Sequence, residues 1–320
     1  MTLARSIRRA WHRFFFHGFS EDGLRLARIY IGIGLLVFHT YQFATLLVLA
    51  PRGATFYFLD PMWHFRLLGI QYHVPLLSLA VYAVLMAATG LMICGRWTRS
   101  AIAVAILAIF YLKGVRDSFT GDVHHRELIP LHLLVLFLLS RCGDARRRDP
   151  PHTAAGPPPL QEWEASWPLK AMQVYVASFY FWSVLAKLRI SGWAWFAGEG
   201  QIQEFLVRRS LRWGVSDGDE LVKNSLSFTL AQYPDLIQVV GLLVLTVEAA
   251  FPVVLFITSA RLRVLFLGTL AIFHVATFVL LDVNFLLIPF VYLVFFDLVP
   301  VHRWLRARLS LWRRAPAPAS

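Results

Sequence analysis

Long apolar blocks constrain the fold of this chain more than any other feature of its sequence. Most are roughly 18 to 25 residues long, the length that a helix needs to cross about 30 Å of hydrocarbon. Alternating segments of about 10 residues, which are typical of transmembrane barrels, are absent from the sequence. The pattern predicts an all-α fold, a polytopic transmembrane helical bundle of about eight spans. The predicted spans are 24–50, 75–95, 99–115, 126–141, 168–188, 235–260, 262–281 and 284–300.

The composition agrees with a membrane domain. Apolar residues make up 58% of the 320 residues and charged residues only 16%, with a mean hydropathy of +0.58. A soluble protein of this length could not hide so much apolar surface, because many of its residues must face water. We expect a single membrane domain over residues 1–320, with an interfacial helix at 1–23, a helical bundle at 24–300 and a basic cytoplasmic tail at 301–320.

The net charge of +12 does not indicate a nucleic-acid-binding protein. The basic residues lie at the edges of the apolar blocks and not on a polar domain. That placement suits anionic lipid headgroups and topology signals. Membrane lipids are therefore expected as partners, and nucleic acid is not.

Amphipathic helices are predicted at both ends of the chain. The N-terminal segment has apolar residues on one helical face and arginines around the rest, which is typical of an interfacial helix and not of a cleavable signal peptide. The stretch from Val301 to Arg314 repeats this pattern with five arginines. The apolar residues are Leu3, Ile7, Trp11, Phe14 and Phe15 at the first end and Trp304, Leu305, Leu309 and Trp312 at the second.

The distribution of Lys and Arg predicts the orientation. With both termini inside, the cytoplasmic segments hold 17 basic residues and the opposite segments hold 9. Both termini are therefore expected in the cytoplasm. Among the longer connections, 51–74 is expected to be re-entrant or interfacial, 142–167 to be a flexible linker, and 189–233 to contain one or two short interfacial helices.

Ionisable residues inside apolar spans are candidate functional residues, because each costs about 2.5–3.5 kcal/mol on insertion scales. Steps of three, four and seven residues return to one helical face, so the polar residues of three spans form stripes that we expect to point into the bundle. The stripes are Gln173, Tyr180, Ser183 and Lys187; Gln238, Gly241, Glu248 and Pro252; and Arg28, Gly32, His39 and Gln42. His274 and Asp282 complete the set of ionisable residues, and Asp282 with Asn284 is expected to form a turn.

Lys187 has two interpretations that the sequence leaves open. It lies at the outer end of its span, where a lysine can anchor the helix by reaching the headgroups. Alternatively it is a partly desolvated amine that acts as a base. His124 and His125 are expected on the same outer side, either as polar loop residues or beside Lys187 in a site. Adjacent histidines are poorly placed to chelate one ion, so no metal is expected.

Glu248 and His274 lie at matching depths in antiparallel spans, about thirteen and twelve residues from their starts. They are predicted to form a buried pair. A structural hydrogen bond that joins two helices is favoured over a proton relay.

Several of these residues occur in motifs that resemble the HTTM (horizontally transferred transmembrane) domain family, which includes the vitamin K-dependent gamma-carboxylases. The most specific motif is Tyr180-Phe181-Trp182-Ser183-Val184-Leu185-Ala186-Lys187-Leu188, followed by Trp195-Phe196-Ala197-Gly198. Other similar pieces are 28–32, His124-His125, 167–169, 248–252 and His274. The resemblance covers nearly the whole chain.

The resemblance implies an eight- or nine-helix membrane domain with its active site on the non-cytoplasmic side. It implies that Lys187 is the base that deprotonates a reduced quinone, of vitamin K or menaquinone type, and that His125, with His124 beside it, assists. Tyr180, Ser183, Trp195 and His39 are expected to contribute to binding, and Glu248 and His274 to be structural polar residues.

The chain also differs from the carboxylases. Ala186 stands where a second lysine is expected, and no large lumenal region follows the membrane part. A small or lipidic substrate is therefore expected in place of a protein glutamate. A carboxylase-like, quinol-linked enzyme is the leading hypothesis, and a non-catalytic lipid-binding or scaffolding membrane protein is the alternative. A transporter ranks last, since matched pairs of broken helices are not apparent.

Overall fold

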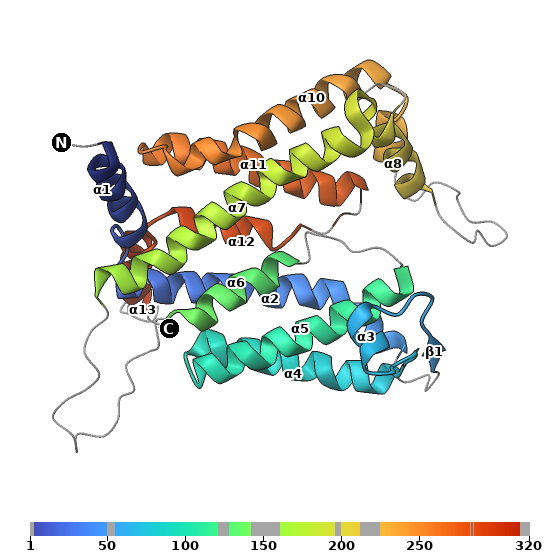
Figure 1. Ribbon diagram of the computed structural model, residues 1–320, viewed down its shortest axis with the longest axis horizontal. Coiled ribbons are helices and arrows are strands. Elements are labelled where there is room, and N and C mark those ends of the chain that lie inside the picture. Colours follow the sequence, from blue (N-terminus) through green and yellow to red (C-terminus); the bar gives the residue numbers. More distant parts are fainter. Residues whose placement is uncertain are drawn as a thin grey trace, which may run out of the picture. The chain divides into compact units, whose positions relative to one another are not determined.

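The computed structural model describes residues 3–49, 55–120, 128–141, 161–195, 200–211, 225–281, 283 and 285–313. Within these ranges the chain is helical apart from turns and one pair of two-residue strands (Figure 1). The strands β1 (Phe56–Tyr57) and β2 (Tyr72–His73) pair antiparallel, with Phe56 opposite His73. The predicted all-α fold is confirmed.

The helices follow the apolar blocks of the sequence closely. The α-helices are α1 (Leu3–Phe16), α2 (Glu21–Leu49), α3 (Trp63–Leu67), α4 (Pro75–Cys94), α5 (Thr98–Thr120), α6 (Leu128–Leu139), α7 (Glu162–Ser191), α8 (Gln201–Ser210), α9 (Ser225–Leu230), α10 (Pro234–Ala250), α11 (Ala260–Leu281), α12 (Ile288–Val291) and α13 (Val299–Arg313). Three 3-10 helices join them: η3 (Gly192–Trp195), η4 (Phe251–Leu255) and η5 (Tyr292–Phe295). The short helices predicted in 189–233 are thus present.

Five helical segments are long and apolar enough to cross a membrane. They are Glu21–Gln42, Pro75–Cys94, Thr98–Phe119, Pro234–Leu255 and Ala260–Leu281. Ile288–Phe295 and Val299–Arg308 make a sixth if the pair, which is bent by 108°, is one span. Only 17% of the apolar window of α11 is buried within the protein. So much exposed apolar surface is unfavourable in water, and these helices therefore indicate a multi-pass membrane protein.

Several helix boundaries differ from the prediction, and the predicted span 284–300 is divided among α12, η5 and the start of α13; α7 and α5 show one cause. Helix α7 begins at Glu162, not at residue 168, and it contains Pro168. Glu162 and Glu164 lie in its first turn, where carboxylates interact favourably with the helix dipole. Helix α5 continues to Thr120, beyond the predicted end at residue 115. Charged residues near both ends caused the error, because they interrupt the apolar pattern without interrupting the helix.

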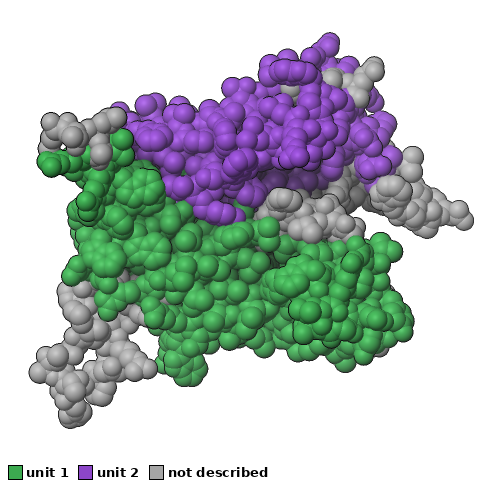
Figure 2. Space-filling view, in the orientation of Figure 1, with its two compact units in different colours: residues 1–172, 290–320 green, residues 173–289 purple. Residues whose placement is uncertain are grey.

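The chain divides into two compact units, shown in separate colours in Figure 2. Unit 1 comprises residues 1–172 and 290–320, and unit 2 comprises residues 173–289. The boundaries fall inside helices α7 and α12. The single membrane domain over residues 1–320 stays a prediction.

In unit 1, α4 packs against both α2 and α5, and α6 packs against α5 (Figure 1). The turn from α4 to α5 is made possible by Gly95, whose φ of 70° is left-handed and therefore suits glycine. Its N–H donates to the carbonyl of Met92, and the next N–H, of Arg96, donates to that of Leu91. This closes α4 and directs the chain into an antiparallel neighbour.

Helix α2 fits between two neighbours through a pair of glycines. A Cβ on Gly32 would lie 2.5 Å from Cγ1 of Ile93 and 3.0 Å from Cε of Met92, both on α4. A Cβ on Gly34 would lie 2.6 Å from Cβ of Phe290 on α12. Real Cβ atoms do not approach other atoms so closely, so both glycines are required by close helix packing.

The 55–74 segment covers one end of α4 and α5. Ser118 of α5 fastens it, because the N–H of Met62 donates to Ser118 Oγ at 2.9 Å and the N–H of Asp60 donates to the Ser118 carbonyl at 3.0 Å. Two residues further on, the buried His64 lies directly on Gly114 of α5, with its ring 4.3 Å from that of Phe110. Glycine at 114 is therefore what allows the imidazole to approach the helix backbone.

Replacing Gly114 by alanine tests this packing. The new Cβ overlaps the imidazole of His64, so we expect Gly114→Ala to destabilise the folded protein by about 1–3 kcal/mol. Thermal unfolding in detergent measures the change. Gly90→Ala is the matched control, since a Cβ there meets nothing within 4 Å. Equal melting temperatures for the two variants would contradict the packing argument.

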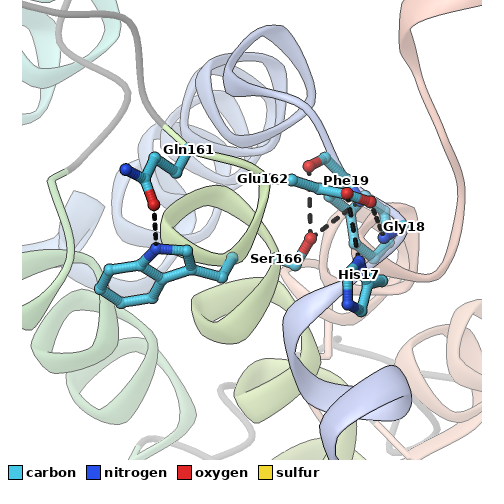
Figure 3. A network of polar contacts seen from close by, with 7 residues as sticks. His17, Gly18, Phe19, Gln161, Glu162 and Ser166 are labelled. Atoms are coloured by element: carbon cyan, nitrogen blue, oxygen red, sulfur yellow. Dashed lines mark hydrogen bonds and ion pairs between the residues drawn. The ribbon is translucent and has the colours of Figure 1, made fainter.

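The link between α1 and α2 is held against the start of α7 by a polar network (Figure 3). The carboxylate of Glu162 accepts the N–H of Gly18 at 2.8 Å and lies 3.2 Å from Nδ1 of His17. The N–H of Phe19 donates to Ser166 Oγ at 3.0 Å, and that hydroxyl donates to the carbonyl of Phe19. The network is local to unit 1 and fixes where α1 leaves the bundle.

The network predicts a pH dependence. The hydrogen bond from Gly18, followed by that from His17, lowers the pKa of Glu162 below its usual 4.5. Because the pKa of Glu162 is lower in the folded state, its ionised carboxylate stabilises the folded protein above pH 4.5. This stabilisation is lost as the pH falls through the lowered pKa. The protection factors of the amides at residues 17–19, which compare the measured hydrogen-exchange rate with the intrinsic rate at the same pH, should therefore fall in acid, and those of Glu162→Gln should be low at all pH values. Glu204→Gln, at an exposed position of α8, should behave as the wild type; protection factors in the wild type that do not change in acid would refute the link.

Unit 2 has its own core around the short helix α8, which packs against α9, α10 and α11. Leu206, Ala231 and Ile237 form a buried cluster there. Ser227 Oγ donates to the carbonyl of Leu280 at 2.6 Å, and Gln203 Nε2 donates to that of Ala231 at 2.8 Å. These contacts join the predicted 189–233 connection to the ends of the apolar helices.

Candidate functional site

One side of the candidate site lies where the apolar helix α10 changes to a 3-10 helix. Helix α10 ends at Ala250 and continues as the 3-10 helix η4, which contains Pro252. Proline has no N–H to bond the carbonyl of Glu248 four residues earlier, and the N–H of Phe251 bonds that carbonyl in its place. Glu248 thus lies in the last turn before the break.

Glu248 forms an ion pair with Lys187 of α7. Nζ of Lys187 lies 2.5 Å from Oε2 of Glu248, and their side chains are 22% and 7% exposed. Nζ also lies 4.6 Å from the ring centroid of Trp195 in η3, a cation–π contact. Lys187 therefore points to a buried carboxylate and an indole ring, which disfavours the interpretation that it only anchors a helix end in the headgroups.

The face of α7 explains why this lysine turns inward. Tyr180, Val184 and Lys187 follow one another at steps of four and three, so they share a face of the helix. Val184 packs with Leu245 of α10, one turn before Glu248, and Trp195 packs against the same cluster. Apolar packing along this face of α7 therefore places the amine of Lys187 beside the carboxylate of Glu248.

A second polar couple lies on the same face of α7. The hydroxyl of Tyr180 is hydrogen-bonded to Nε2 of His274 in α11. The phenol ring stacks on Phe251 with centroids 4.2 Å apart and planes 14° apart. The ring centroids of His274 and Phe285 lie 4.7 Å apart. Both side chains are almost fully buried and cannot bond to water, so each satisfies the hydrogen-bonding need of the other.

The predicted Glu248–His274 pair is wrong. Glu248 binds Lys187, and His274 binds Tyr180. The prediction matched the two residues by their depth along the helices, but depth does not fix which way each side chain faces. The ammonium of Lys187 offers the carboxylate an opposite charge, which a neutral imidazole cannot.

The other predicted site residues divide into three groups. Ser183 is half-buried one turn before Lys187 in unit 2. His39 is buried in unit 1, with its ring 5.1 Å from that of Phe38, and so belongs to the other unit. His124 and His125 lie outside the described residues, as does Asp282.

Sequence reasoning missed a buried ion pair in unit 1. Lys113 and Asp117 of α5 pair at i,i+4 spacing with side chains only 9% and 2% exposed. The spacing is itself a signal for a helical ion pair, but the predicted span ended between the two residues. His64, whose ring nitrogens have no hydrogen-bond partner among the described residues, was missed as well.

The described residues do not offer a ready site for a metal ion. Within the described ranges, His, Cys, Asp and Glu side chains nowhere form a group of three or more that could hold an ion. The Lys187 site offers a cation, a carboxylate, a phenol, an imidazole and an indole. Those groups suit proton transfer and the binding of an aromatic ring more than metal ligation.

Comparisons with known proteins give no relationship: no protein-family model matches the chain, and neither a curated protein nor a solved structure matches it. The resemblance to the HTTM family therefore stays a prediction that depends on the motifs themselves.

The ion pair can be tested by removing one partner or both. Lys187→Met leaves the buried Glu248 carboxylate without a counter-charge, and we expect it to destabilise the protein by about 3–5 kcal/mol. Lys187→Met combined with Glu248→Leu should recover most of that loss, because no uncompensated charge remains. Thermal unfolding of the wild type, Lys187→Met, Glu248→Leu and the double variant in one detergent completes the double-mutant cycle. Simple additivity of the two substitutions would mean that the pair does not exist in the folded protein.

Proposed function

We propose that this chain is an HTTM-like integral membrane protein that acts as a carboxylase-like enzyme on a quinol, with Lys187 at the centre of proton transfer. The ion pair between Lys187 and the buried Glu248 is the observation that supports this most. Two opposite charges inside apolar helices need a reason, and a proton-transfer site supplies one.

A reduced quinone of vitamin K or menaquinone type is the proposed cofactor. Its ring and hydroxyl groups match what surrounds Lys187: an indole at Trp195, the Tyr180–His274 couple, and an ammonium that can stabilise a developing oxyanion. We expect a small or lipidic substrate. His125 and His124 are proposed to assist from the loop before α6, and His39 and Ser183 to contribute to binding.

The proposed topology has eight spans. A helix lies at each of the eight predicted segments, and the five that are long and apolar enough include α10 and α11, which flank the site. Helices α1 and α13 are proposed to lie in the interface, with exposed Trp11 and Trp304 toward lipid. Both termini are then cytoplasmic, and the site is on the non-cytoplasmic side.

The alternative is a non-catalytic lipid-binding or scaffolding membrane protein, and the terminal helices favour it. Helices α1 and α13 carry four arginines each and no acidic residue. Such helices bind anionic lipid without any catalysis. On this view the Lys187–Glu248 pair only holds α7 to α10.

Quinol oxidation separates the two functions. Purified protein is given reduced menaquinone or vitamin K under oxygen, and epoxide is measured by chromatography. We expect the wild type to form epoxide and Lys187→Ala to lose at least roughly 10²-fold of the rate, as removal of a positioned proton-transfer group does.

The matched control is Lys170→Ala, which removes a lysine from the same helix in unit 1, where it lies over the rings of Phe14 and Phe19. It should retain the wild-type rate. Equal rates for the wild type and Lys187→Ala would remove Lys187 from catalysis and leave the scaffolding function in place.

A further inference from the structure

The protonation state of the Lys187–Glu248 pair limits what Lys187 can do alone. A lysine acts as a base through the lone pair of its neutral amine. In an ion pair the ammonium has no lone pair, and the only vacant position for a proton is on the carboxylate. If the pair instead exists as a neutral amine and a carboxylic acid, the number of bound protons is the same. In either form the pair can accept one more proton.

We propose that Glu248 is the group on which the proton removed from the substrate is finally held, with Lys187 as the residue that contacts the substrate. This inference rests on the proposed function of the site and deepens it. The exposure of the two side chains supports the division of roles, since Lys187 is 22% exposed and Glu248 only 7%. Lys187 is the accessible end of the pair, and Glu248 is the inner end.

The step balances without any co-reactant. The O–H bond of a quinol or phenol breaks, and its electron pair stays on oxygen as an oxyanion. A proton of the Lys187 ammonium passes across the 2.5 Å contact to Oε2 of Glu248, which frees the lone pair of Nζ, and the proton of the quinol or phenol passes to that lone pair. The products are an oxyanion, an ammonium and a carboxylic acid. Before the step the ammonium is paired with the carboxylate, and afterwards it is paired with the oxyanion.

The surroundings favour this exchange of partners. The ring of Trp195 lies 4.6 Å from Nζ and stabilises the cation whichever anion it faces. A neutral carboxylic acid is a better occupant of an apolar interior than a carboxylate that has lost its counter-ion. Glu248 therefore acts through Lys187: it positions the ammonium at rest and stores the proton during the reaction.

The other titratable groups described near Glu248 are Tyr180 on α7 and His274 on α11. They are hydrogen-bonded to each other through the phenol oxygen and Nε2. His274 is the rival acceptor, because it lies within electrostatic range of Lys187. An experiment on the proposal must therefore tell a protonated carboxyl group from a protonated imidazole.

Infrared difference spectroscopy makes that distinction. Full-length protein in phosphatidylcholine vesicles is titrated with 4-nitrophenol, a phenol whose phenolate absorbs visible light, in a buffer acidic enough to keep free 4-nitrophenol un-ionised. We expect phenolate absorbance to appear together with a carbonyl band of a newly protonated carboxyl group. Glu248→Gln should lose both signals. Glu204→Gln, which removes an exposed carboxylate paired with Arg208 in the same unit, should keep both.

Three results would overturn the proposal: no spectral change in the wild type, phenolate formation without the carboxyl band, or a carboxyl band that persists in Glu248→Gln. The proposed function fails separately. Epoxide formation that needs Lys187 but not Glu248 would leave the function standing and remove this inference. The phenolate absorbance and the carboxyl band, both seen in a protein that never forms epoxide, would leave this inference standing and remove the proposed function.

Discussion

The apolar surroundings of Lys187 and Glu248 constrain the rest of unit 2. The Glu248 side chain is only 7% exposed and cannot be solvated as a lone carboxylate, so the ammonium of Lys187 must compensate it. The pair therefore fixes the rotation of α7 and α10 about their own axes. The consequences are visible nearby: Val184 packs on Leu245, Trp195 covers the ammonium, and the helix changes to 3-10 geometry just after Glu248.

Apolar block length predicted the position of every long helix, because burial in hydrocarbon is a strong and local constraint. Helix ends were less predictable. Glu162 and Glu164 look like loop residues in a hydropathy profile, yet they begin α7, and Lys113 and Asp117 look like the end of a span, yet they form a buried pair inside α5. A hydropathy profile treats each residue separately, so it does not register that two charged residues compensate each other.

The residues of the candidate site were found from the sequence, but their partners were not. Helical spacing correctly placed Tyr180 and Lys187 on one inward face. Which residue each one meets depends on the relative rotation of α7, α10 and α11, and the spacing of polar residues along one helix does not give that rotation. Glu248 and His274 were therefore paired with each other by depth, although each has its partner on α7.

The two glycines of α2 have a consequence for evolution. Gly32 faces Ile93 and Gly34 faces Phe290, so the interval of two residues encodes contact with two different neighbours. A deletion or insertion of one residue between the two glycines would rotate one of them away from its neighbouring helix by about 100°, which is the rotation per residue of an α-helix. We therefore expect relatives of this chain to keep two glycines at that spacing in the helix.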